Sequence, residues 1–107
     1  MKGRVLIIDD DNLVGISLKK ALTKLDYEVD ICDNGEDAVS KIEQFLPEVI
    51  LLDIYLTTHN GIDLLKDFQK RFFTIPVIMI TGYSDVKIAV SAMKSGAFDF
   101  LLKPIDL

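Results

Sequence analysis

Val49-Ile50-Leu51-Leu52-Asp53 is a run of four apolar residues that ends in an acid. The same form recurs in three other runs: residues 5–8 before Asp9-Asp10-Asp11, residues 77–80 before Thr81, and residues 100–102 before Lys103-Pro104. Short, continuously apolar runs are typical of strands that a parallel sheet buries on both faces. The carboxyl ends of such strands lie side by side, so the carboxylates, the hydroxyl and the ammonium are expected to meet in one cleft. Such a cleft suits Mg²⁺ and a phosphoryl group.

Segments with helical periodicity separate these runs. Apolar side chains recur at three- and four-residue spacing within residues 14–25, 38–45, 64–72 and 86–93. Asp11 or Asn12 is the expected N-cap of the first helix, and the fourth is expected from Asp85 to a C-cap at Gly96. The alternation of strand and helix predicts a parallel sheet with right-handed crossovers and helices on both faces.

The polarity of the strands also predicts their order. Residues 27–32 alternate between apolar and polar, as a half-exposed edge strand does, and Phe98-Asp99-Phe100 begins the last strand with alternation too. Edges at strands 2 and 5 fit the order 2-1-3-4-5. The fold class is therefore α/β, a doubly wound, flavodoxin-like, five-stranded parallel sheet. Its ligands bind beyond the strand carboxyl ends, at the switch point between strands 1 and 3.

Composition excludes several classes of protein. A chain of 107 residues forms one domain, residues 1–107, and its net charge of −5 offers no basic stripe for nucleic acid. The single Cys32 excludes an internal disulfide and a cysteine zinc site. The apolar runs are too short to span a membrane, and the acids after residue 8 do not fit a signal peptide. We therefore expect a cytoplasmic protein that binds no membrane.

The acids at the strand ends indicate a particular chemistry. Carboxylates as close as Asp9, Asp10 and Asp53 repel one another unless a cation neutralises them, and Mg²⁺ prefers oxygen ligands. Asp53 stands alone at its strand end, which suits a nucleophile that attacks phosphorus. Lys103 and Mg²⁺ would neutralise charge, and Thr81 would donate a hydrogen bond to a phosphoryl oxygen. Taken singly, each residue could be an ordinary cap or loop residue.

These residues together resemble the receiver domain of two-component response regulators. The resemblance covers essentially the whole chain and rests on four motifs: the acids after Leu6-Ile7-Ile8, Asp53 with Gly61, Thr81-Gly82, and Lys103-Pro104. Residues 89–100 are most similar to receivers of the nitrogen-regulation type, which precede ATPase domains that activate sigma-54 transcription. The resemblance thus implies transcriptional regulation through a C-terminal output domain.

The resemblance also implies a role for each residue of the site. Asp53 is the phosphoacceptor and takes its phosphoryl group from the phosphohistidine of a sensor histidine kinase. Asp10 binds Mg²⁺ directly, Asp9 binds it largely through water, and the backbone carbonyl of Tyr55 is a third protein ligand. Lys103 pairs with the phosphoryl group, and the Lys103-Pro104 peptide bond is cis.

A conformational switch is implied between Thr81 and Phe100. When the phosphoryl group draws the Thr81 hydroxyl inward, the vacated space admits the ring of Phe100. This is a two-state element biased by a local charge. Phe100 is otherwise interpreted as part of the core at an edge strand, and His59 as a solvated loop residue rather than a phosphodonor.

The chain departs from the family pattern in three places. Leu56-Thr57-Thr58 stands where the family often has Met-Pro, so a more mobile loop is expected. Tyr55 and Tyr83 occupy positions that in the family flank the path of attacking water, and two bulky side chains there are expected to slow dephosphorylation. The sequence stops before a fifth helix, which predicts one half-bare apolar sheet face. We interpret the chain as a truncated N-terminal part of a longer regulator, and a homodimer is the alternative cover for that face.

Two other functions remain open from the sequence. One is a Mg²⁺-dependent phosphohydrolase of another α/β fold with an aspartate nucleophile, for which Asp9 and Asp11 have the right spacing. It leaves Asp53 and Lys103-Pro104 unexplained. The other is a degenerate receiver that only binds proteins, against which the complete set of site residues argues. The leading hypothesis is a phosphoacceptor that assists its own phosphorylation and hydrolysis but is not a turnover enzyme.

Overall fold

The computed structural model describes residues 2–82 and 86–105, which form one sheet flanked by helices. Its strands are β1 (Arg4–Ile8), β2 (Glu28–Cys32), β3 (Val49–Asp53), β4 (Val77–Thr81) and β5 (Asp99–Leu102). Its helices are α1 (Asn12–Lys24), α2 (Ala38–Phe45), α3 (Gly61–Arg71) and α4 (Val86–Lys94). Asp85, where the fourth helix was expected to begin, lies outside the described residues, as does Tyr83.

The sheet is parallel, with the strand order β2-β1-β3-β4-β5, so the predicted fold class and order are confirmed. The polarity argument holds for each strand. The central strand β3 is buried from Ile50 to Asp53, whereas β2 is buried only at Val29 and Cys32, and β5 at no position. Continuous apolarity thus marks the strands that have a neighbour on each side.

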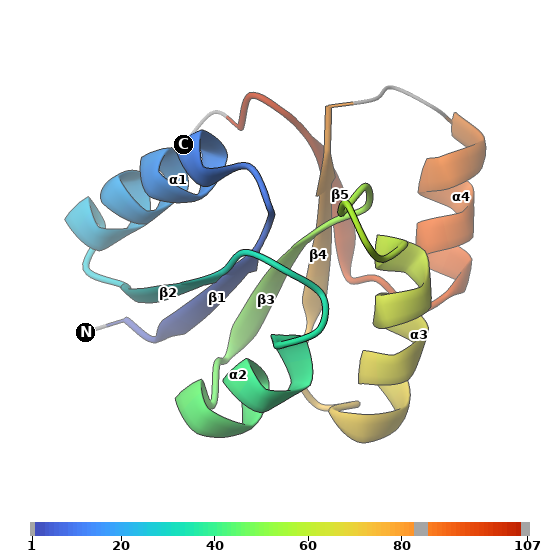
Figure 1. The fold of residues 1–107 in the computed structure, drawn as a ribbon, viewed down its shortest axis with the longest axis horizontal. Coiled ribbons are helices and arrows are strands. Elements are labelled where there is room, and N and C mark those ends of the chain that lie inside the picture. The colour runs from blue at the N-terminus through green and yellow to red at the C-terminus, as the bar shows by residue number, and fades with distance from the viewer. Residues whose placement is uncertain (1, 83–85, 106–107) are drawn as a thin grey trace.

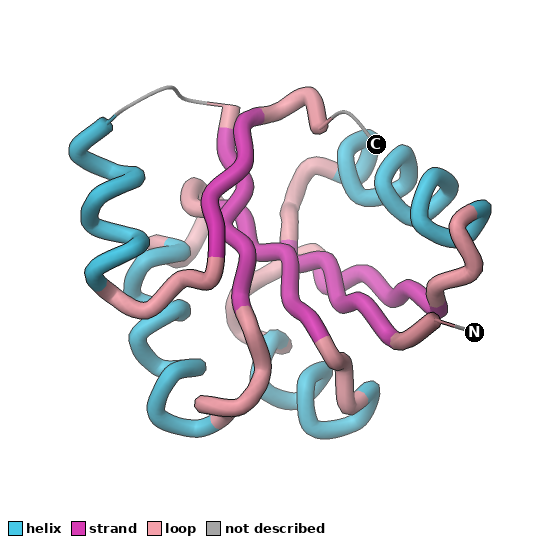
Figure 2. Tube along the Cα trace, turned by 180° about the vertical axis from the view of Figure 1, so that it is seen from behind, coloured by secondary structure: helices cyan, strands magenta, loops and turns pink. Residues whose placement is uncertain are grey.

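The helices cover the two sheet faces unequally. Figure 1 shows α1 on one side of the sheet and α2, α3 and α4 on the other, and Figure 2 shows the same arrangement from behind. The larger core, under α2 to α4, is centred on Leu6, Ile50, Leu65, Phe68 and Met79, all fully buried.

The smaller core lies under α1, which packs Leu18 and Leu22 against the sheet. Beside α1 the sheet face is hollow, with a volume of about 280 Å³. Val49, Ile78 and Leu101 line this hollow and are only half-buried. The sheet face that was expected to be thinly covered is therefore the face of α1.

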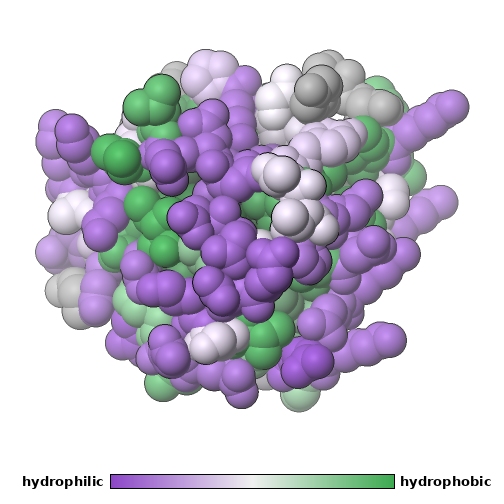
Figure 3. All heavy atoms as spheres, viewed as in Figure 1, coloured by the Kyte–Doolittle hydropathy of each residue, from purple (hydrophilic) through white to green (hydrophobic). Residues whose placement is uncertain are grey.

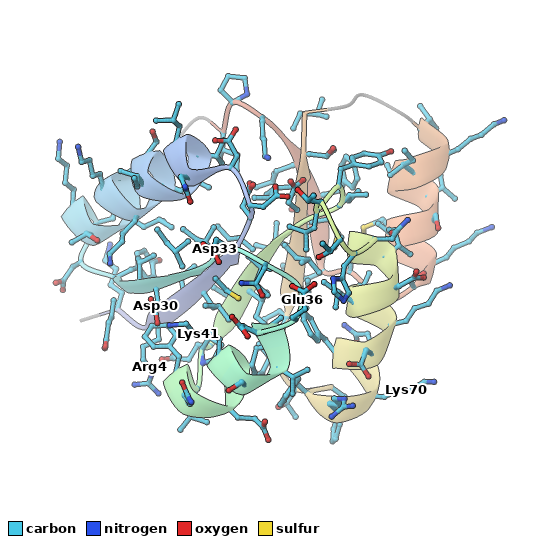
Figure 4. All side chains as sticks on the ribbon, in the orientation of Figure 1. Arg4, Asp30, Asp33, Glu36, Lys41 and Lys70 are labelled. Atoms are coloured by element: carbon cyan, nitrogen blue, oxygen red, sulfur yellow. The ribbon has the colours of Figure 1, made fainter. Side chains whose placement is uncertain are left out.

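Local interactions explain where the helices start and stop. Asp11 is the N-cap of α1, since its Oδ1 accepts hydrogen bonds from the backbone N–H groups of Leu13 (3.0 Å) and Val14 (3.4 Å). Gly96 follows α4 with φ +103°, a left-handed value that glycine adopts without strain. Between elements, Lys41 of α2 forms an ion pair of 3.0 Å with Asp30 of β2 (Figure 4).

The surface carries both polar and apolar side chains. On the face shown in Figure 3, hydrophilic atoms dominate, and hydrophobic atoms occur in several separate areas. Among the described helices, none combines the length and apolarity that crossing a membrane requires.

Candidate functional site

Three carboxylates meet at the carboxyl end of the two central strands. Asp9 and Asp10 follow β1 directly, and Asp53 is the last residue of β3. β1 and β3 are hydrogen-bonded neighbours, with Ile8 opposite Leu52, so the two strand ends coincide. One oxygen atom from each carboxylate lies within 4.8 Å of the others. The structure thus brings together the three acids that the sequence placed in one cleft.

Lys103 lies against the two more buried acids. Its Nζ is 2.8 Å from Oδ2 of Asp9, which is fully buried, and 3.4 Å from Oδ2 of Asp53, which is 5% exposed. Burial, together with the charge of Asp9, raises the pKa of Asp53 even though Lys103 opposes the shift. Burial alone would lower the pKa of Lys103, but its contacts with Asp9 and Asp53 outweigh that effect and raise it.

The backbone at the end of β5 holds Lys103 in place. The N–H of Lys103 donates to the carbonyl of Thr81 at 2.8 Å, which joins the ends of β5 and β4. The Lys103-Pro104 peptide bond is cis, as the family resemblance implied.

Thr81 and Phe100 lie on neighbouring strands. Thr81 is fully buried at the end of β4, one residue beyond the partner of Asp53 in the β3–β4 register. Phe100 of β5 lies opposite Met79, and its half-buried ring packs against the larger core. Residues two apart on a strand face the same side, so Thr81 and Phe100 share the α4 side of the sheet.

The loop between β3 and α3, residues 54–60, reaches back across the acids. Tyr55 begins its exposed part, 43% exposed, and its N–H lies 3.4 Å from Oδ1 of Asp53. Thr57 donates its backbone N–H (2.6 Å) and its hydroxyl to Oδ2 of Asp10. The hydroxyl of Thr57 holds the pKa of Asp10 below its usual value. Sequence reasoning missed this contact: the loop was noted as a departure from the family, but no spacing rule brings Thr57 to Asp10.

The same loop also touches the loop between β2 and α2. Nδ1 of His59 is 2.9 Å from Oγ1 of Thr58 and 3.7 Å from Oε1 of Glu36, which is labelled in Figure 4. A Cβ atom at Gly35 would overlap the His59 ring, so the ring packs directly on the backbone there. A hydrogen bond from Thr58 holds the pKa of Glu36 below its usual value; the backbone of Glu36 and, least of all, His59 add to this effect. His59 therefore joins two loops, a contact that the interpretation as a solvated residue did not include.

The donor set of the cluster fits a small, hard cation. Its oxygen atoms come from carboxylates, the ligands that Mg²⁺ takes in proteins. Oδ2 of Asp9 is buried and accepts no hydrogen bond of good geometry from the described residues; the charge beside it is Lys103. Lys103 supplies one positive charge against three carboxylates, so the cluster keeps negative charge that a further cation can neutralise. The cluster can therefore hold a metal ion.

Asp11 does not join the cluster. Its side chain is committed to the first turn of α1, as the helix-cap interpretation predicted. The phosphohydrolase alternative needs Asp11 as a reacting acid beside Asp9, so the structure does not favour it.

Comparison with known proteins agrees with this geometry. Residues 5–107 match the family described as the response regulator receiver domain. The chain is 36% identical over 104 residues to the regulatory protein AtoC of Escherichia coli K12, covering 97% of this chain and 23% of AtoC. It is 36% identical over 106 residues to the transcriptional regulator NtrC of the same strain, covering 99% of this chain and 23% of NtrC.

The fold is also similar to that of solved structures. The crystal structure of NtrX from Brucella abortus superposes with a TM-score of 0.92 at 30% identity, over 99% of this chain and 24% of that one. The chain thus spans about a quarter of the length of the relatives it matches.

Proposed function

The chain belongs to the response regulator receiver domain family, and we propose that it is a phosphoacceptor that carries its phosphoryl group on Asp53. One observation carries this proposal: Asp53 lies within an acidic cluster that can hold a cation and has the ammonium of Lys103 3.4 Å from its Oδ2. A nucleophilic carboxylate, a cation site and a fixed positive charge are the groups that phosphoryl transfer to an aspartate needs.

Asp53 acts as the nucleophile. A carboxylate oxygen of Asp53 attacks the phosphorus of a phosphohistidine, the P–O bond forms, and the P–N bond breaks. The histidine nitrogen leaves with the electron pair of that bond. Burial favours this attack, because the carboxylate of Asp53 is poorly solvated and loses little hydration when it reacts.

The remaining site residues hold the phosphoryl group. Lys103 pairs with a phosphoryl oxygen, and Thr81 donates its hydroxyl to another. Asp9, Asp10, Asp53 and the carbonyl of Tyr55 would hold Mg²⁺. The cation, when bound, neutralises charge on the phosphoryl oxygens. Water can then attack the same phosphorus: a new P–O bond forms, the P–O bond to Asp53 breaks, and inorganic phosphate leaves. The domain thus assists its own dephosphorylation without being a turnover enzyme.

Thr81 and Phe100 couple the phosphoryl group to the surface. When Thr81 turns toward a phosphoryl oxygen, the space that it leaves admits the Phe100 ring from its half-buried position. The likeness to NtrC, a DNA-binding transcriptional regulator, supports an output that regulates transcription through a domain attached to the receiver. We further propose that the protein acts in the cytoplasm. A sensor histidine kinase is the proposed phosphodonor, and a second copy of the chain is a further proposed partner.

Phosphorylation by a small-molecule donor tests the proposal. We expect the protein, incubated with phosphoramidate and Mg²⁺, to gain one phosphoryl group, seen by mass spectrometry of the intact chain. Asp53→Asn should abolish the gain, since an amide is not a nucleophile here. Asp11→Asn is the matched control, because asparagine can still cap α1 and Asp11 lies outside the cluster. A phosphoryl group that persists in Asp53→Asn contradicts the assignment of Asp53.

A further inference from the structure

Asp10 differs from the other two acids in what holds it. Asp9 and Asp53 are buried and lie beside Lys103, whose two ion pairs among the described residues go to them. Asp10 is half-buried, at the start of the loop between β1 and α1. Carboxylates as close as these disfavour one another's negative charge. Asp10 therefore needs another contact to stay in the cluster.

Thr57 supplies that contact. Its backbone N–H, at 2.6 Å, and its hydroxyl both donate to Oδ2 of Asp10. A carboxylate oxygen has two lone pairs, so these two donors fill the capacity of Oδ2. Oδ1 receives neither of these donors, so it can still bind a cation. Two donors from one residue also define the plane of the carboxylate, which a single hydrogen bond does not.

The position of Thr57 is itself fixed by the ends of its loop. The N–H of Gly61 donates to the carbonyl of Ile54 at 2.6 Å and closes the loop at its base. Asn60 caps α3 by accepting from the N–H of Ile62 at 2.8 Å. On the outer side, His59 packs on Gly35 of the neighbouring loop. Thr57 is thus presented to Asp10 by a braced segment.

We propose that Thr57 is a positioning residue that orients the carboxylate of Asp10 for Mg²⁺ binding. The inference rests on the proposed function, because it concerns the cation that this function uses. Groups that hydrogen-bond a metal-binding carboxylate typically raise metal affinity by about 10- to 100-fold.

Mg²⁺ affinity, measured by isothermal titration calorimetry on the whole chain, tests this role. Thr57→Val removes the hydroxyl but keeps the shape and the backbone N–H, and we expect the dissociation constant to rise about tenfold. Thr57→Ser keeps the hydroxyl and should restore the wild-type affinity. Thr58→Val is the matched control: its neighbouring hydroxyl contacts His59 and not Asp10, so it should leave the affinity unchanged.

The outcomes separate this inference from the proposed function. If the wild type binds Mg²⁺ and Thr57→Val binds it equally well or more tightly, Thr57 does not orient Asp10. If the wild type binds no Mg²⁺ and gains no phosphoryl group, the proposed function itself fails. Thermal unfolding without Mg²⁺ should be alike in Thr57→Val and Thr58→Val. Should Thr57→Val fail to fold, Thr57→Ala gives the same comparison of affinities.

Discussion

Asp53 combines a reactive position with an unfavourable environment. It is nearly buried, lies close to Asp9, and has its pKa raised by both, with Lys103 only partly compensating. Burial disfavours the charged form of a carboxylate. It therefore makes the carboxylate more reactive and, at the same time, makes the fold less stable. The contribution of Asp53 to stability should therefore depend on pH in a direction that can be derived.

The stability linked to Asp53 is lost as pH rises. Because the folded protein holds the proton of Asp53 more tightly than the unfolded chain, this stability is fully present below the ordinary carboxyl pKa, near 3.9. It disappears as pH rises through the raised value. Asp53→Asn should thus be more stable than wild type at pH 7 by about 1 kcal/mol in urea unfolding with EDTA, and the gap should narrow toward pH 4.

An exposed carboxylate gives the control for that experiment. Glu43→Gln removes a negative charge from the exposed surface of α2 and should leave the stability within about 0.5 kcal/mol of wild type at every pH. An Asp53→Asn protein that is less stable than wild type at pH 7 would mean that the contact with Lys103, not burial, dominates at Asp53.

At the scale of the elements, Gly61 sets how closely α3 approaches β3. A Cβ atom at residue 61 would overlap the carbonyl oxygen of Asp53 and the Cα atom of Ile54, both in the backbone. Backbone atoms cannot turn aside as a side chain does, so Gly61→Ala should cost about 1–3 kcal/mol of unfolding free energy. Chemical denaturation measures this loss.

Gly82→Ala is the matched comparison. No heavy atom of the described residues lies within 4 Å of a Cβ atom built there, so the substitution should change stability by less than about 1 kcal/mol. Equal losses of stability in the two variants would show that α3 can move away from β3 at little cost in free energy.

The elements were also what the sequence predicted best. The burial of each strand follows local patterns in the sequence. These patterns are the spacing of apolar residues, the polar residue that ends each apolar run, and the alternation of polar and apolar residues in β2. The N-cap at Asp11 was one of two predicted choices for the same reason. Strand ends then brought Asp9, Asp10 and Asp53 together, since parallel strands place their carboxyl ends at one edge.

The contacts made by loops could not be predicted. Thr57 meets Asp10 across 47 positions of sequence, and His59 meets Gly35 across a second loop. Their conformation depends on where the flanking strands and helices sit, not on a residue pattern. The sequence raised Leu56-Thr57-Thr58 only as a departure that would loosen the loop. The hydrogen bonds from Thr57 to Asp10 were not part of that expectation.

The whole molecule is a sheet with two unlike faces. Three helices pack over one core, and α1 packs over the other, beside a hollow of about 280 Å³. Truncating a leucine should therefore reduce the free energy of unfolding more on one face than on the other. A cavity in the tightly packed core cannot collapse, whereas side chains beside the hollow can move into the space.

Leu51 and Leu52 allow this comparison at adjacent residues of β3. Leu52 is fully buried in the larger core, whereas Leu51 is 8% exposed and lines the hollow. Leu52→Ala should cost about 3–5 kcal/mol and Leu51→Ala about 2 kcal/mol or less in the same denaturation experiment. Costs that are equal, or larger for Leu51→Ala, would mean that both faces are packed alike.

The closed base of the loop between β3 and α3 has a consequence for engineering. Gly61 and Ile54 pin the two ends of this segment, and Thr57 stands midway between them. The length of this loop, seven residues from 54 to 60, therefore matters more than the identity of most of its residues. A chimaeric protein with a foreign loop here should keep the length of seven residues and a Ser or Thr at the fourth position, where Thr57 stands. One inserted residue would move the hydroxyl away from Asp10.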